Sequence, residues 1–194
     1  MKSNNIALIL IDIQKGFDDH TYWGGARNNP NAEQNASKIL NTWRANGLPI
    51  FHVKHDSTNP QSKLAPNQLG NQIQDIVKPL PTEPVISKNV NSAFIGTDLK
   101  ERLDKQQIKS LVIVGLTTDH CVSTSVRMAG NLGYKVQVIS DATATFDKVS
   151  PSGEKLSAEL IHNANLASLH NEFATVLTTQ ELLKSLQNNE ATLL

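Results

Sequence analysis

Cysteine is nearly absent from this sequence: Cys121 is the only one among 194 residues. A lone thiol cannot form a disulfide within the chain, which excludes a small disulfide-stabilised scaffold and agrees with a reducing compartment. Net charge is absent as well, because the chain has 18 basic and 18 acidic residues and no block of basic residues. We therefore expect no nucleic-acid partner, since such proteins carry a basic patch that meets the phosphates.

Long apolar runs are also missing. The longest clean run, residues 6–11, is far too short to span a bilayer and lacks the charged flank and cleavage site of a signal peptide. We therefore expect a cytoplasmic protein with no membrane partner. A hydrophobic content of 39% over 194 residues is enough for one sizeable core, which predicts a single domain over residues 1–194.

Short apolar runs alternate with amphipathic stretches along the chain. Runs such as residues 111–114 do not alternate apolar with polar residues, which is typical of strands buried on both faces of a parallel sheet. The predicted class is α/β, with a six-stranded parallel sheet between layers of helices. The predicted strands are residues 6–11, 49–54, 84–87, 111–115, 135–140 and 174–178.

Signals for helix starts and ends lie between these strands. The predicted helices run from Asn29-Pro30 to Gly47, from Thr97-Asp98 to before Ile108, over 122–133, over 153–171, and from a capping box of Thr178 and Glu181. Residues 56–82 contain four prolines and show weak periodicity. They predict a long surface excursion that serves as an active-site rim or an oligomer contact.

The lone cysteine follows a predicted strand and a short turn, at the point where a helix begins. Unpaired N–H groups and the helix dipole lower a thiol's pKa in such a position, which predicts a nucleophilic thiolate near neutral pH. Hydrolases present nucleophilic serines in the same strand-turn-helix arrangement. The alternative for Cys121 is a small buried hydrophobic residue without chemistry.

Two charged residues follow other predicted strands. Asp12 comes directly after residues 6–11, and Lys88 follows residues 84–87. Reactive side chains collect at the carboxyl ends of parallel strands, although a turn aspartate and a solvated lysine are the structural alternatives. With Cys121 these residues would supply a thiol, a carboxylate that accepts its proton and an ammonium that holds the negative charge.

Three segments carry these residues in one order: residues 8–17, residues 86–88 with Ser92-Ala93-Phe94, and residues 115–122. They resemble the three signatures of the isochorismatase-like cysteine hydrolases, and the resemblance extends from about residue 6 to residue 183. It implies a doubly wound, Rossmann-like three-layer sandwich and a catalytic Asp12-Lys88-Cys121 triad.

The resemblance also implies details of the turn before the cysteine. It places a non-proline cis peptide between Leu116 and Thr117, and it makes the N–H groups of His120 and Cys121 candidates for an oxyanion hole. The substrate pocket is expected from Gln14 and from aromatic residues, namely Phe17, Tyr22, Trp23 and Phe94, with core packing as the alternative for the phenylalanines.

The expected reaction is hydrolysis of an amide-type C–N bond in a small molecule through a thioester, because Cys121 is retained. In the vinyl-ether branch of the family the aspartate acts as the acid and the cysteine is dispensable. Nicotinamidase-like members carry zinc on an Asp-x-His motif after the second strand, and this chain does not reproduce that order there. We therefore expect no metal and no cofactor, while a weak site from His52, His55 and Asp56 stays open.

The remaining histidines and the partners complete the expectations. His120 is expected to line or cap the site rather than pair with the neighbouring thiol. His162 and His170 are expected to be solvated or to face another subunit. Besides a small-molecule substrate, the predicted partner is a second copy, in a homodimer or homotetramer. A non-catalytic α/β protein and a redox sensor are the alternatives, and the latter lacks a second, resolving cysteine.

Overall fold

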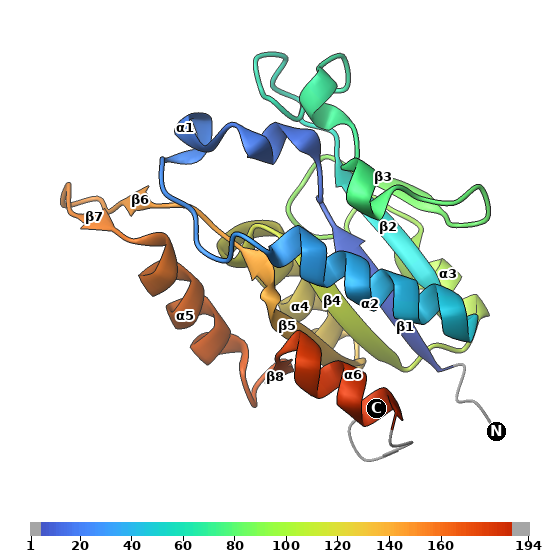
Figure 1. The fold of residues 1–194 in the computed structure, drawn as a ribbon. Coiled ribbons are helices and arrows are strands. Elements are labelled where there is room, and N and C mark those ends of the chain that lie inside the picture. The colour runs from blue at the N-terminus through green and yellow to red at the C-terminus, as the bar shows by residue number, and fades with distance from the viewer. Residues whose placement is uncertain (1–4, 188–194) are drawn as a thin grey trace.

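The computed structural model, which describes residues 5–187, contains a six-stranded parallel sheet in the order β3-β2-β1-β4-β5-β8 (Figure 1). The strands are β1 (Ile6–Ile11), β2 (Ile50–His55), β3 (Val85–Lys88), β4 (Ser110–Leu116), β5 (Lys135–Ala144) and β8 (Thr175–Leu177). The chain winds outward from β1 in one direction and from β4 in the other, so the strand order reverses between these two central strands. The predicted doubly wound α/β class is confirmed.

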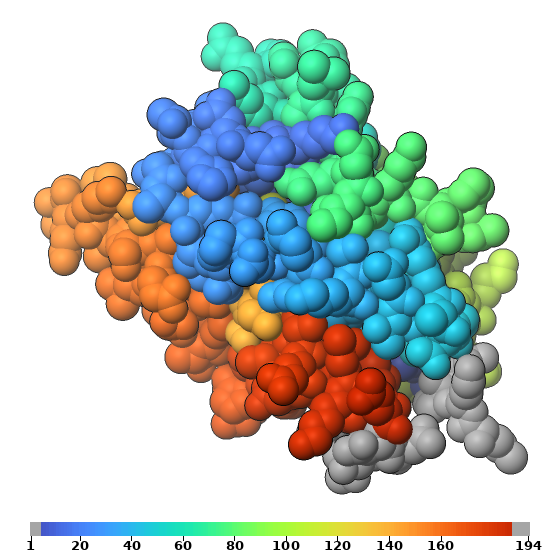
Figure 2. Space-filling model, viewed as in Figure 1, coloured from blue at the N-terminus to red at the C-terminus, as the bar shows by residue number. Residues whose placement is uncertain are grey.

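Helices cover both faces of this sheet. On one face lie α2 (Ala32–Asn46) and α6 (Thr179–Gln187), which Figure 2 shows side by side. On the other lie α3 (Leu99–Lys105), α4 (Ser123–Asn131) and α5 (Ala158–Leu169). Every residue of β1 is buried: Ile6, Leu8 and Leu10 pack toward α2, whereas Ala7, Ile9 and Ile11 pack toward the opposite helices. Burial on both faces explains the continuous apolar run.

Local signals set several helix ends. Gly47 ends α2 in the left-handed conformation with φ of 62°, and Thr178 exchanges hydrogen bonds with Glu181 in the predicted capping box. The predicted helix over 153–171 is wrong at its start, because residues 155–156 pair with residues 148–149 in a small hairpin, β6 (Lys148–Val149) and β7 (Lys155–Leu156). The side chain of Ser157 then caps α5 by accepting the Leu160 N–H.

The segment over 56–82 is anchored rather than a plain surface excursion. It contains the 3-10 turns η2 (Leu69–Asn71) and η3 (Asp75–Val77) and packs beside a further turn, η1 (Lys15–Asp18), that follows β1 (Figure 2). Asn71 is buried, and its amide donates to the carbonyl oxygens of His55 and Leu64 at 3.1 and 2.8 Å. The segment therefore forms part of the rim above the carboxyl ends of β1 and β2.

The two central strands approach most closely where the site begins. Gly115 in β4 lies opposite Ile11 in β1 and has φ of 125°, a conformation that L side chains rarely adopt. A Cβ at this position would collide with the Ile11 carbonyl oxygen. Glycine at position 115 therefore brings the end of β4 directly against the residue that precedes Asp12.

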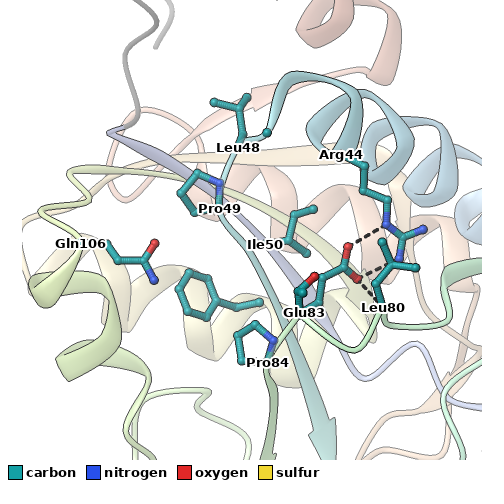
Figure 3. Close-up of a pocket in the computed structure, with 11 residues that line it drawn as sticks. Arg44, Leu48, Pro49, Ile50, Leu80, Glu83, Pro84 and Gln106 are labelled. Carbon is teal, nitrogen blue, oxygen red and sulfur yellow. Dashed lines mark hydrogen bonds and ion pairs between the residues drawn. The ribbon is translucent and has the colours of Figure 1, made fainter.

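A polar cluster lies at the opposite, amino-terminal end of β2 and β3, beside a cavity of about 330 Å³ that Leu48, Pro49 and Gln106 line (Figure 3). Arg44 donates twice to the Glu83 carboxylate, at 2.7 and 2.8 Å, and His52 Nε2 donates to it at 3.0 Å. Burial works to raise the pKa of Glu83, but these bonds and the Leu80 N–H outweigh it and hold the pKa at about 2.

We expect Glu83→Gln to lower the free energy of unfolding by about 1–3 kcal/mol at pH 7, because it removes charged hydrogen bonds from a buried cluster. A carboxylate whose folded-state pKa is depressed contributes stability above its ordinary value of 4.5, and this contribution is lost as pH falls toward about 2. The difference between wild type and variant, measured by urea unfolding, should therefore shrink over that window. Glu172→Gln, at an exposed position, is the control and should change little.

Four expectations concern the surroundings of the protein, its assembly and its domain organisation. Among residues 5–187, no helix is both long and apolar enough to cross a membrane. The single domain, the cytoplasmic location and the homodimer or homotetramer stay predictions.

Candidate active site

The structure brings together the three residues that the sequence singled out. Asp12 follows β1, Lys88 ends β3, and Cys121 lies in a π-helical turn, Thr118–Val122, that follows β4. Lys88 Nζ donates to Asp12 Oδ2 at 2.7 Å and to Cys121 Sγ at 3.2 Å. All three are buried, and Cys121 is the most accessible with 8% of its surface exposed. An ammonium therefore bridges a carboxylate and a thiol inside the protein.

The backbone of Asp12 contributes to this arrangement. Its φ of 52° lies in the left-handed region, which aspartate tolerates better than most residues. One carboxylate oxygen, Oδ2, accepts from Lys88, while the buried Oδ1 has no hydrogen-bond partner among the described residues. Oδ1 therefore has free lone pairs, and the Cys121 sulfur lies within 4.8 Å of one oxygen of this carboxylate.

The prediction of a lowered thiol pKa is wrong in sign. Burial, together with the negative charge of Asp12, raises the pKa of Cys121, and the Lys88 ammonium opposes this only in part. The start of α4 cannot compensate, because a π-helical turn precedes it and the sulfur is almost enclosed. Burial also raises the pKa of Asp12, again against Lys88. Burial therefore disfavours the thiolate at this position.

The turn before the cysteine has a constrained backbone. The peptide bond between Leu116 and Thr117 is cis, and the Thr117 hydroxyl is buried without a hydrogen-bond partner among residues 5–187. The His120 N–H donates to the Thr117 carbonyl oxygen at 3.2 Å, so this donor is engaged and fits the expected oxyanion hole poorly. The Cys121 N–H remains the candidate donor. The His120 side chain is 55% exposed and its Nε2 lies 3.4 Å from Asp119 Oδ2, and its expected role of lining or capping the site stays a prediction.

Two residues that sequence reasoning missed lie against the triad. His55, at the end of β2, accepts a hydrogen bond from Lys88 Nζ through Nδ1 at 3.1 Å. Asn91, in the exposed loop after β3, places Oδ1 3.7 Å from Cys121 Sγ. The carboxyl-end rule that selected Asp12 and Lys88 could also have selected His55, whereas nothing in the sequence marks Asn91.

The open metal site of His52, His55 and Asp56 does not assemble. Side chains alternate along a strand, so positions 52 and 55 of β2 point to opposite faces of the sheet. His52 is accordingly bonded to Glu83 in the amino-terminal cluster, while His55 faces Lys88. Among the described residues, the group with metal-donor atoms close together is instead Asp12, His55 and Cys121, all within 4.8 Å of one another.

The chain is similar to known proteins over most of its length. The family profile described as Isochorismatase domain matches residues 6–181. The chain is 50% identical over 177 residues to the isochorismatase family protein YrdC of Bacillus subtilis, covering 91% of this chain and 94% of that protein. The chain belongs to the isochorismatase family. It is therefore a member of a family of hydrolases, as the sequence signatures indicated.

Further members of the family extend the comparison. The crystal structure of an isochorismatase-family protein from Chromobacterium violaceum superimposes with a TM-score of 0.92 and 42% identity, over 97% of this chain and 96% of that one. Nicotinamidase 3 of Arabidopsis thaliana is 27% identical over 199 residues, covering 94% of this chain and 89% of that protein.

In this isochorismatase-family chain Gln14 does not line a pocket. It is fully buried, its Nε2 donates to the carbonyl oxygens of His55 and Asn71 at 3.0 and 2.9 Å, and its Oε1 accepts the His55 N–H at 2.8 Å. The prediction of a substrate contact is corrected, because every polar atom of the Gln14 side chain bonds to the protein. Gln14 instead fixes the end of β2 against β1.

The predicted aromatic wall is largely a packing cluster. Phe17 is 3% exposed and stacks on Trp23 at a ring separation of 4.6 Å, and Trp23 donates its indole N–H to the Gly16 carbonyl oxygen. Tyr22 is 45% exposed, and Phe94 stacks on Tyr134 at 6.1 Å. These contacts agree with core packing, which was the alternative for the two phenylalanines.

His162 corrects another expectation. It is 4% exposed rather than solvated, and its Nδ1 lies 2.8 Å from the hydroxyl of Thr118. This contact ties α5 to the turn that carries Cys121. His170, by contrast, is exposed. A helical spacing of eight residues did not reveal the difference, because the helix ends at Leu169 and His170 continues in extended backbone.

Proposed function

We propose that this protein hydrolyses an amide-type C–N bond of a small molecule, with Cys121 as nucleophile, Asp12 as proton carrier and Lys88 as the residue that orients both. The observation that carries the proposal is the Lys88 ammonium, which donates to the carboxylate at 2.7 Å and to the thiol sulfur at 3.2 Å. A relative whose name is nicotinamidase supports an amide as the substrate class.

In the first half-reaction Asp12 accepts the thiol proton as Sγ attacks the carbonyl carbon. The S–C bond forms, and the Cys121 N–H stabilises the negative charge that develops on the carbonyl oxygen. Collapse of this intermediate breaks the C–N bond, and Asp12 returns the proton to the departing nitrogen. An amine or ammonia leaves, and the acyl group remains on sulfur as a thioester.

In the second half-reaction water replaces the amine. Asp12 accepts a proton from water as its oxygen attacks the thioester carbon, the S–C bond breaks, and the proton returns to the sulfur. Lys88 keeps its charge throughout and stabilises whichever of the two partners is anionic. The raised pKa of Cys121 suits this scheme, because the thiol gives up its proton only when attack begins.

One observation favours a second candidate function, hydrolysis of a vinyl ether with Asp12 as the acid. Burial raises the pKa of Asp12, as a proton-donating carboxyl group requires. In that reaction Cys121 would not form a bond, so the two functions differ in their dependence on the thiol.

The proposed function is tested by incubating the protein with a panel of small amides, ureides, carbamoyl compounds and nicotinamide, and measuring released ammonia. We expect release from at least one class, and no release above background from the Cys121→Ala variant. Asn91 lies beside the nucleophile, so Asn91→Ala should raise KM more than it lowers kcat for the active class. A vinyl ether that is turned over while every C–N substrate is inert would overturn the proposal.

A further inference from the structure

The ammonium of Lys88 has a third partner besides the two of the proposed mechanism. A lysine ammonium has three N–H donors and no acceptor. Its contacts in this site are Asp12 Oδ2 at 2.7 Å, Cys121 Sγ at 3.2 Å and His55 Nδ1 at 3.1 Å. Each proton of the ammonium therefore has one acceptor, contributed by a different strand end: β1, β4 and β2.

We propose that His55 is the positioning residue of this site, and that its imidazole, protonated on Nε2 and neutral, holds the Lys88 ammonium between Asp12 and Cys121. The inference rests on the proposed function for what the ammonium does in turnover. The position of the ammonium depends only on its hydrogen bonds within the protein, so it can be tested without a substrate.

The protein fixes His55 more firmly than a strand end requires. Its backbone N–H donates to Gln14 Oε1 at 2.8 Å, and its carbonyl oxygen accepts from Gln14 Nε2 at 3.0 Å and from Asn71 Nδ2 at 3.1 Å. His55 also lies opposite Lys88 in the parallel pairing of β2 with β3. Two buried amide side chains and the strand register thus set where the imidazole stands.

The charges around His55 agree with a neutral ring. Burial and the adjacent Lys88 ammonium lower the pKa of His55, while Asp12 and Asp56 act in the opposite direction without reversing the shift. Because Lys88 only donates, Nδ1 must be unprotonated and the ring proton must be on Nε2. A protonated Nδ1 would place a donor against the ammonium and break the contact.

The three residues that accept from the ammonium, Asp12, His55 and Cys121, each offer a metal-donor atom, and these atoms lie within 4.8 Å of one another. Carboxylate, imidazole and thiolate together form a donor set that suits zinc or cobalt. In the intact site the Lys88 ammonium bonds to all three of them. If His55 Nδ1 truly points at the same place as the other two, removing the ammonium should leave a three-ligand site for such an ion.

The first experiment compares His55→Phe with His55→Asn. Phenylalanine keeps a ring but offers no acceptor, whereas the asparagine oxygen can stand near the position of Nδ1. We expect His55→Phe to slow alkylation of Cys121 by iodoacetamide at pH 8 by about 10-fold or more, as expected for the loss of a bond to a buried charge, and His55→Asn to restore most of the rate. His52→Asn, on the other face of β2, is the matched control and should alkylate like wild type. Equal rates in His55→Phe and wild type would overturn the proposal.

The second experiment uses Co²⁺ alone as a probe in Lys88→Ala. We expect binding with a thiolate-to-cobalt charge-transfer band, because the metal displaces the thiol proton, and loss of that band in Lys88→Ala combined with His55→Phe. No band in either protein, or the same band in both, would show that His55 does not face the ammonium position. Neither experiment needs turnover. A failure of the hydrolase proposal would appear in the ammonia assay, whereas a failure of the His55 proposal would appear in the alkylation rates and the cobalt spectra. Circular dichroism of each variant checks that it is folded.

Discussion

Replacing Cys121 by alanine is expected to lower turnover of the amide substrate by about 10⁴-fold or more, since loss of a nucleophile removes the covalent path itself. The substitution removes only the buried sulfur atom, and alanine keeps the backbone of the turn over Thr118–Val122. The thermal midpoint should therefore change far less than the rate. Ammonia release under substrate saturation measures the first quantity and differential scanning calorimetry the second.

Cys121→Ser sharpens the same test. Serine has the same shape as cysteine with a slightly smaller, more polar hydroxyl, and that hydroxyl gives up a proton less readily than a thiol does. We expect this variant to lose most of the activity as well, with substrate binding preserved. Wild-type turnover in Cys121→Ala would disprove the thiol mechanism and move the assignment to hydrolysis in which Asp12 acts as the acid.

The second large effect is expected from Asp12→Asn. Asparagine retains the size of the side chain and an oxygen for Lys88, but it cannot accept the thiol proton, so turnover should fall by about 10²- to 10⁴-fold. The reactivity of the thiol should move in the opposite direction. The negative charge of Asp12 raises the pKa of Cys121, so its removal should shift the alkylation profile of Cys121 to lower pH.

Lys88→Met provides the converse variant. The ammonium lowers the pKa of Cys121, so its loss should shift alkylation by iodoacetamide to higher pH while turnover falls. Asp98→Asn, at an exposed position, is the control and should change neither the alkylation profile of Cys121 nor the turnover. Superimposable alkylation profiles in wild type, Asp12→Asn and Lys88→Met would mean that the thiol titrates independently of Asp12 and Lys88. The triad would then have to be withdrawn.

The sequence predicted the sheet and the position of the triad because both depend on short-range patterns. Continuous apolar runs mark strands buried on two faces, and polar residues directly after such strands must lie at one edge of a parallel sheet. Asp12 and Lys88 were found in this way, and Cys121 was found from its position after a predicted strand and turn, where a helix was expected to begin. The hairpin of β6 and β7 was missed because its strands have two residues each, too few for any periodicity.

Other properties of the site depend on how deeply a side chain is buried and where it points, and a sequence pattern gives neither. The pKa of Cys121 was predicted from the start of a helix, but enclosure of the sulfur decides its sign. Gln14 follows Asp12 closely and was expected at the substrate, yet its amide is used to fasten β2. His162 becomes buried because Thr118, far away in sequence, supplies a partner.

Strand β2 carries two histidines whose separation by three residues assigns them to different environments. Burial lowers the pKa of both imidazoles, yet one belongs to the Arg44 and Glu83 cluster and the other to the reacting centre. The two imidazoles therefore lie on opposite faces of the sheet. Substitutions at His52 should therefore change the stability of the fold at low pH without altering the reactivity of Cys121.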